Sequence, residues 1–187
     1  GADGYQNINM DDLKLPPHSI DAEQSIIGGL LLNNDVLMNI SSIVNGDDFY
    51  RHDHRLIFLS IKDLIDANEP CDVLTLAEAL VTKNQLEEAG GFAYIGNLVK
   101  NTPSAANIKA YAQIVRERSV LRQLIKIGSN ISDNGFNPEG RKSAELIEEA
   151  EQQVFDIADH GAALKGGFLG MKELLKKNVD RIDKLFH

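Results

Sequence analysis

Two glycines within GGFAYIGNLVKNTPSAANI (residues 90–108) have the spacing of a phosphate-binding loop. Gly91 and Gly96 form the pattern G-x-x-x-x-G, in which backbone N–H groups surround phosphate oxygens. Such a loop also needs Lys and then Ser or Thr directly after the second glycine, but Asn and Leu follow Gly96. No parallel-strand pattern precedes the stretch. We therefore predict no nucleotide site here and expect a short amphipathic helix over residues 91–100.

A second candidate for chemistry is the metal-like cluster His52-Asp53-His54. Side chains two residues apart on a helix point to different faces, whereas two zinc-binding histidines on one helix stand four residues apart. We therefore predict no metal site. The three residues are interpreted as the N-terminal end of a helix, with one histidine ring that faces the surface.

The lone cysteine and the carboxylates are the remaining candidates. Cys71 has no His near it in the sequence, so it is interpreted as a small half-buried side chain, although a spatial neighbour would make it a nucleophile. The carboxylates fall on charged helix faces, where solvation is the default. The patterns G-x-S-x-G, H-E-x-x-H and C-x-x-C do not occur in the sequence. We predict no catalytic residue, no cofactor-binding residue and no metal ligand in this chain.

Composition indicates a soluble protein that binds other proteins. The 187 residues are 43% hydrophobic and 25% charged, which is ordinary for a globular chain. A single cysteine forms no intramolecular disulfide, which favours a reducing, cytoplasmic setting. No signal peptide or membrane-spanning run is apparent. The net charge of −9 argues against direct nucleic-acid binding, because phosphate contacts need clustered Lys and Arg.

The pattern of hydrophobic residues predicts an all-α fold. Apolar residues recur at helical spacing, and no alternating run with hairpin turns is present. Residues 1–17 are interpreted as a flexible N-terminal arm and residues 18–103 as a small globular helical bundle. The expected helices of the bundle are one capped by Ser19 with Asp21 and Glu23 in its first turn, one over 36–44 capped by Asp35, one over about 53–67 and one capped by Asp72.

A long helical hairpin is predicted over residues 104–160. Ser104 is expected to cap a helix that runs to about Asn134, some 45 Å long at 1.5 Å per residue. The turn signal DNGFNPEG follows it, and a second helix is expected over 143–159. The residues assigned to self-association are Val115, Leu121, Leu124, Ile125, Ile147 and Val154.

The two arms of this hairpin differ in charge. The first carries Lys109, Arg116, Arg118, Arg122 and Lys126, and the second carries six carboxylates without a cation. Opposed charge favours antiparallel pairing of the arms. Two interpretations stay open: an intramolecular hairpin with solvated flanks, or a projecting hairpin that pairs with a second copy.

The last part of the chain is predicted to be a linker followed by one amphipathic helix. Residues 161–170 contain four glycines, and residues 171–187 place apolar residues on one face of a helix. Such a helix is marginal alone, so it either folds back on the same body or docks on a partner, which the long tether favours. The residues assigned to docking are Leu174, Leu175, Val179, Ile182, Leu185 and Phe186.

Four blocks of the sequence carry a family resemblance. They are LKLPPHSIDAEQSIIGGLLL (13–32), DDFYRHDHRLIF (47–58), DVLTLAEAL (72–80) and GGFAYIGNLVKNTPSAANIKAYAQIVRERSVLRQLI (90–125). In this order and spacing they resemble the N-terminal domain of DnaB-type bacterial replicative DNA helicases. The final VDRIDKLF resembles the linker helix of that family.

The resemblance implies the collar of a hexameric ring that unwinds DNA at the replication fork with ATP. Family members pair through their hairpins into a trimer of dimers and recruit DnaG-type primase. Their linker helix packs on the ATPase domain of the neighbouring protomer, where helicase loaders act. The RecA-like motor, with its ATP and Mg, is expected beyond His187. Two alternatives remain: a free-standing helical adaptor or inhibitor that mimics the collar, and a small enzyme whose site is assembled across the fold.

Overall fold

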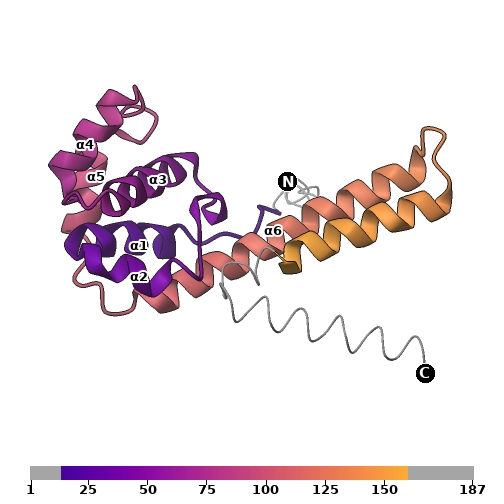
Figure 1. Cartoon of the computed structure of the whole chain (residues 1–187), viewed down its shortest axis with the longest axis horizontal. Helices are drawn as coiled ribbons and strands as arrows, with labels where there is room; N and C mark the ends of the chain where they lie inside the picture. Colours follow the sequence, from indigo (N-terminus) through magenta and orange to yellow (C-terminus); the bar gives the residue numbers. More distant parts are fainter. Residues whose placement is uncertain (1–13, 160–187) are drawn as a thin grey trace, which may run out of the picture.

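A computed structural model of the chain describes residues 14–159, and every regular element in that range is helical (Figure 1). The all-α prediction is therefore confirmed for this part of the chain. In chain order the elements are α1 (Ile20–Leu32), the 3₁₀ turn η3 (Asn34–Val36), α2 (Leu37–Ile40), the 3₁₀ turn η4 (Gly46–Asp48), α3 (His52–Asp66), α4 (Val73–Thr82), α5 (Gly91–Lys100), α6 (Ile108–Phe136) and a last helix over 143–159.

The globular body is built around α1, which packs against α3, α5 and α6. The sequence IDAEQSIIGGLLL is apolar on most of its faces, and helices of that kind are buried. The side chains that are fully buried around it come from all the helices of the body, among them Ile26, Ile27, Leu30, Ile40, Phe49, Ile57, Phe58, Ile61, Leu76, Leu80 and Ile95.

Helix ends confirm some of the predicted caps and correct others. Ser19 accepts a hydrogen bond from the backbone N of Ala22, and Asp72 forms a reciprocal capping box with Thr75. Asp35 is not a cap: the Asn33 side chain accepts from the backbone N of Asp35.

The predicted helix over 36–44 is shorter in the structure, since α2 ends at Ile40. Ser41 and Ser42 follow, and serine favours turns over helix interiors because its hydroxyl competes for backbone groups. Ser104 does not cap the long helix either. Its hydroxyl accepts from Ala106 within a turn, and α6 begins at Ile108.

The stretch with phosphate-loop spacing is helix α5, with the predicted bounds Gly91–Lys100. The two glycines at its start lie in the left-handed region, with φ of +97° at Gly90 and +84° at Gly91. Such a backbone favours glycine, so this pair serves the turn into α5. Gly96 lies inside the helix, with open space where a Cβ would stand.

Two glycine substitutions are expected to act in opposite directions. A Cβ on Gly28 would lie 2.0 Å from Thr102 Oγ1 and 2.8 Å from the Leu98 carbonyl oxygen, where α1 meets the end of α5. Thr102 Oγ1 donates to that carbonyl at 2.7 Å, so it does not move away freely. We expect Gly28→Ala to lower the free energy of unfolding by about 2–3 kcal/mol. Gly96→Ala is expected to raise it by about 0.5–1 kcal/mol, because alanine favours helix. Urea denaturation measures both; equal effects would contradict the assigned close contact.

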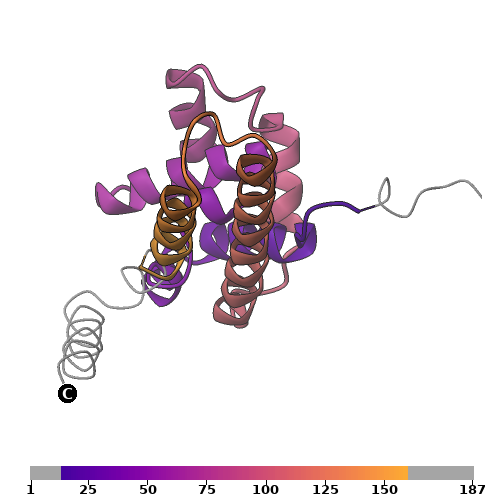
Figure 2. The ribbon, with the colours of Figure 1, turned by 90° about the vertical axis from the view of Figure 1, so that its right-hand side faces the viewer.

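The long helix α6 belongs to both the body and the hairpin. Its early residues Ile108, Ala112, Val115 and Ser119 are buried in the body, so a division of the chain at residue 104 does not fall at a break in the core. Beyond them α6 leaves the body, and the helix over 143–159 returns beside it (Figures 1 and 2). Figure 2 looks at the hairpin from its tip and shows the two arms side by side.

Candidate functional site

The hairpin exposes large apolar side chains along both arms. We call this set the hairpin face: Leu124, Ile125, Ile131, Ile147, Val154 and Phe155, which are 43–59% exposed. Isolated apolar residues are normal on a surface, but six on one projecting element indicate an interaction site. The hairpin face is therefore the main candidate for binding a partner.

A buried polar cluster fixes the base of the hairpin to the body; we call it the root brace. Asp48 is 2% exposed, and its Oδ1 accepts from Arg116 Nη1 and from Ser119 Oγ, both at 2.7 Å. Its Oδ2 accepts from the backbone N of Asn45 at 2.8 Å. The carbonyl oxygen of Asp48 accepts from Arg122 Nη2 at 2.6 Å. This cluster ties η4 to two successive turns of α6.

Arg122 also joins the N-terminal segment to the hairpin. Its Nη1 donates to the carbonyl oxygen of Pro17 at 2.6 Å, and its guanidinium lies 5.4 Å from the centre of the Tyr50 ring. The His18 ring stacks on the same Tyr50 ring, with the two ring centres 4.3 Å apart. Burial lowers the pKa of Arg122, while the charges of Glu23 and Asp48 raise it.

These contacts correct the expected role of the basic arm. Arg116 and Arg122 were predicted to oppose the acidic arm across the hairpin, but both donate to the body instead. The guanidinium groups lie on the side of α6 that packs on η4, where buried acceptors bind them more strongly than solvated carboxylates would.

A second buried polar cluster lies in the core, formed by Glu23, His54 and Tyr94. Glu23 is 1% exposed; its Oε2 accepts from the backbone N of Tyr50 at 2.8 Å and its Oε1 from His54 Nδ1 at 2.8 Å. His54 Nε2 lies 2.6 Å from the Tyr94 hydroxyl, which accepts from Gln24 Nε2 at 3.2 Å. If the Nδ1 of His54 carries the proton, the ring donates to Glu23 and accepts from the Tyr94 hydroxyl, so both ring nitrogens have a partner.

The geometry of this Glu–His–Tyr chain resembles a proton relay, but its role is structural. Both nitrogens of His54 have partners, and its ring is fully buried. Burial raises the pKa of the Tyr94 phenol, which keeps it a hydroxyl donor. A general base must reach a proton on a substrate, and His54 reaches only protein atoms. The cluster holds α1, α3 and α5 together.

The histidine cluster is thus divided between core and surface. His52 is exposed and lies 3.2 Å from Glu88, as expected of the surface ring, whereas the His54 ring is fully buried. The Asp53 side chain accepts a hydrogen bond from the backbone N of His54 in the first turn of α3, as expected of a carboxylate at a helix N-terminus. Within residues 14–159 no group of three or more His, Cys, Asp or Glu side chains is arranged to hold a metal ion.

Cys71 is buried rather than half-buried, with 3% of its surface exposed. Burial, together with the nearby charge of Asp72, raises the pKa of its thiol to about 12. Its backbone N donates to the Asn34 side chain at 3.0 Å. A thiol with this pKa is not a nucleophile at neutral pH.

Comparison with known proteins identifies the family. The model for the DnaB-like helicase N-terminal domain matches residues 15–117, more than half of the chain. The chain belongs to the DnaB-like helicase N-terminal domain family. The crystal structure of the N-terminal domain of DnaB helicase from Mycobacterium tuberculosis has a TM-score of 0.73 at 35% identity, over 76% of this chain and 99% of its own. The predicted family and fold are confirmed.

Curated relatives extend beyond this domain. The replicative DNA helicase DnaB of Haemophilus influenzae is 40% identical, and that of Geobacillus stearothermophilus 36%, each over 92% of this chain. The chain spans about 37% of the length of these relatives and corresponds to their N-terminal domain, which is not the catalytic part. A solved DnaB-like replicative helicase, described with its interactions with primase, has a TM-score of 0.60 at 24% identity, over 73% of this chain and 31% of its own. At that identity it shows a shared fold.

In this DnaB-like domain the residues assigned to self-association have different environments. Leu124, Ile125, Ile147 and Val154 belong to the exposed hairpin face, and Leu121 is partly buried. Val115 is 1% exposed and packs in the core of its own chain, so it is not available to a partner. Spacing in the sequence did not separate Val115 from the exposed residues, because one apolar stripe of α6 runs from the body into the hairpin.

The docking residues of the predicted linker helix, in 171–187, lie outside the described residues, as do the 161–170 linker and the first thirteen residues of the arm. Of the helices in the described range, none combines the length and apolar character needed to cross a bilayer.

Proposed function

We propose that this DnaB-like N-terminal domain is an assembly module of a hexameric replicative DNA helicase that unwinds DNA at the replication fork. The observation that carries the proposal is the hairpin face, a set of exposed apolar side chains along both arms of a hairpin that Asp48 and Arg116 fix to the body. Its partner is the hairpin of a second copy, and three such pairs form the collar of the ring. The 37% share of the curated helicases covered by this chain supports the same reading.

The chemistry of unwinding belongs to the RecA-like motor of the longer protein. ATP and Mg bind there, in a cytoplasmic protein of the bacterial replisome. The reading frame beyond His187 tests this part directly: a G-x-x-x-x-G-K-[ST] sequence within about 60 codons is expected. A stop codon in that interval would favour the free-standing adaptor instead.

Recruitment of partners completes the proposed role. The collar binds a DnaG-type primase, in line with the primase interactions described for a DnaB-like helicase of the same fold. The segment 171–187 packs on the motor domain of a neighbouring protomer and is where a helicase loader acts. The net charge of −9 supports binding to proteins and little direct binding to DNA.

Pairing through the hairpin face predicts a specific loss of self-association. Ile147 is 59% exposed, so Ile147→Asp is expected to change the free energy of unfolding by no more than about 0.5 kcal/mol. In a paired hairpin the new carboxylate would be buried without a partner, which weakens dimerisation by about 2 kcal/mol or more. The dimer dissociation constant therefore rises at least about 30-fold. Sedimentation velocity across a micromolar concentration series measures this constant.

Gln152→Asp provides the matched control. Gln152 is an exposed polar residue of the same arm, about 140° around the helix from Ile147, so a carboxylate there stays solvated and leaves pairing unchanged. Ile131→Asp on the other arm, at a residue that is 43% exposed, should reproduce the loss seen with Ile147→Asp. A parent chain that stays monomeric throughout the series, or equal weakening by Gln152→Asp, would refute pairing through this face.

A further inference from the structure

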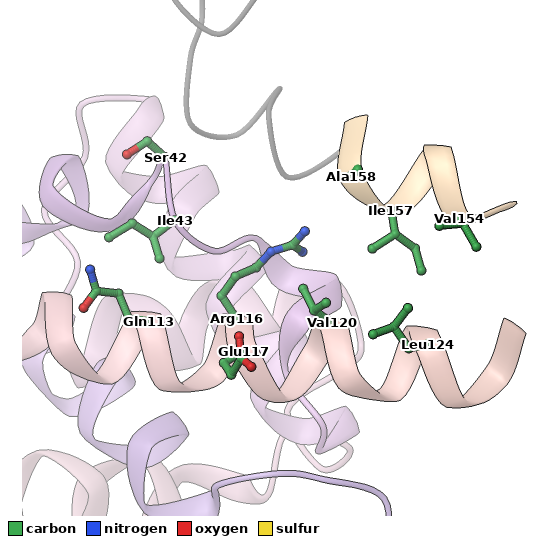
Figure 3. Close-up of a pocket in the computed structure, with 10 residues that line it drawn as sticks. All are labelled: Ser42, Ile43, Gln113, Arg116, Glu117, Val120, Leu124, Val154, Ile157 and Ala158. Carbon is green, nitrogen blue, oxygen red and sulfur yellow. The ribbon is translucent and has the colours of Figure 1, made fainter. Parts of the chain in front are cut away.

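An apolar groove lies at the root of the hairpin, between the body and both arms. Its apolar lining is Ile43 from the segment after α2, Val120 and Leu124 from α6, and Val154, Ile157 and Ala158 from the second arm. Figure 3 shows Val154 and Ile157 pointing across the groove toward Val120 and Leu124. The groove encloses about 730 Å³. It is large enough to take several side chains from one face of a helix.

The position of the groove along the chain indicates what fills it. Ala158 lines the groove and the described chain ends at residue 159, so the following residues start at its edge. Residues 160–170 reach at most about 40 Å when extended, and a tether of this length gives an effective concentration of about 1 mM. The start of the segment 171–187 therefore cannot lie more than about 40 Å from the end of the described chain.

The sequence of 171–187 complements the groove in polarity. Its apolar residues fall on one helical face, which suits the apolar lining. Lys172, Lys176, Lys177, Arg181 and Lys184 outnumber Glu173, Asp180 and Asp183, so five cations against three carboxylates leave a charge of +2.

The second arm beside the groove has the opposite charge. It carries Glu145, Glu148, Glu149, Glu151, Asp156 and Asp159 and no cation, a charge of −6. A basic amphipathic helix placed along an acidic arm gains electrostatic attraction as well as apolar burial.

We propose that residues 171–187 dock as an amphipathic helix in the root groove of their own chain, as a third helix beside the hairpin. This goes beyond the proposed assembly role, in which the same segment packs on the motor domain of a neighbour, and it gives the segment a resting site before that contact forms. Ile125, Ile131 and Ile147 of the hairpin face lie outside the groove lining, so a docked segment leaves them open for pairing.

A spin label in the full chain tests the proposal by nuclear magnetic resonance. Asp183→Cys places a nitroxide on the segment, and the native Cys71 stays unlabelled because burial raises the pKa of its thiol to about 12. We expect the methyl signals of Ile43, Val120 and Ile157 to fall to below about one tenth of their diamagnetic intensity, because an effective concentration near 1 mM keeps the segment docked. Leu80 in α4, at the end of the body away from the hairpin, should keep its signal (Figure 1).

Two variants and one mixing experiment complete the test. Ile182→Asp removes the apolar face of the segment and should restore the groove signals, whereas His187→Asp puts the same carboxylate on the polar face and should not. The mixing experiment uses Ile147→Asp chains, in which pairing through the hairpin face is weakened: an isotope-labelled chain mixed with a separate spin-labelled chain should then show no loss of signal. Undiminished groove signals in the labelled chain would overturn the proposal. Loss that appears in the mixture would overturn it too, since a second copy would then supply the segment.

Discussion

Glu23→Ala is expected to lower the free energy of unfolding by about 4 kcal/mol, because it removes the acceptor from a buried hydrogen-bond network. The carboxylate of Glu23 accepts from the backbone N of Tyr50 at 2.8 Å, from that of Arg51 at 3.4 Å and from His54 Nδ1 at 2.8 Å. Alanine leaves these donors without partners in a site that is 1% exposed. Removing a carboxylate from an exposed surface ion pair typically lowers the free energy of unfolding by only about 0.4 kcal/mol, so the loss expected here is about ten times larger.

Urea denaturation at neutral pH measures this loss, and Asp21→Ala is the matched control. Asp21 lies in the same first turn of α1 but faces solvent, so only its contribution to the helix dipole is removed, about 0.5 kcal/mol. Similar losses for the two variants would show that Glu23 acts only as a charge at the helix end. That outcome would contradict its role as the shared acceptor of three donors.

The helices that sequence reasoning located well are those whose signals are local. Ser19 and Asp72 cap the helices that they were predicted to cap, because a cap bonds to a backbone group two or three residues away. The helix over 91–100 has its predicted bounds, since two glycines with positive φ set its start. Periodicity and turn chemistry contain all the information that these elements need.

The polar clusters were missed because their partners are distant in sequence. Glu23 was assigned to the helix dipole, yet its partners lie 27 to 31 residues further along the chain. One signal was present: Glu23 stands four and seven residues before Ile27 and Leu30, on the apolar face of α1. A carboxylate inside such a stripe is either solvated at the edge of the core or buried with donors, and only the packing of α3 decides which.

The hairpin was predicted from its turn and its length, but its two surfaces were not separated. Val115 and Leu124 belong to the same apolar stripe in the sequence, whereas one is 1% and the other 45% exposed. The last fully buried residue of α6 is Ser119, and that limit depends on how η4 packs. Arg116 and Arg122 were likewise assigned by charge alone, while buried acceptors on Asp48 determine where they bind.

Asp48→Ala is expected to lower the free energy of unfolding by about 3–4 kcal/mol, the range found when one partner of a buried ion pair is removed. The substitution leaves the Arg116 guanidinium, which donates at 2.7 Å, and the Ser119 hydroxyl, also at 2.7 Å, without their acceptor. The carbonyl bond to Arg122 comes from the backbone and is retained in the variant. The root of the hairpin should therefore loosen before the body unfolds.

Hydrogen exchange together with urea denaturation distinguishes this local loosening from a general loss of stability. Amides of α6 near Ser119 should exchange about 100-fold faster in Asp48→Ala, which corresponds to about 2.7 kcal/mol of local opening, while amides of α1 follow the global transition. Asp47→Ala is the matched control, because Asp47 is exposed in the same turn and should alter neither measurement. A double-mutant cycle with Arg116→Ala should give a coupling energy of about 2 kcal/mol or more. A coupling near zero would mean that Asp48 and Arg116 do not brace the hairpin together.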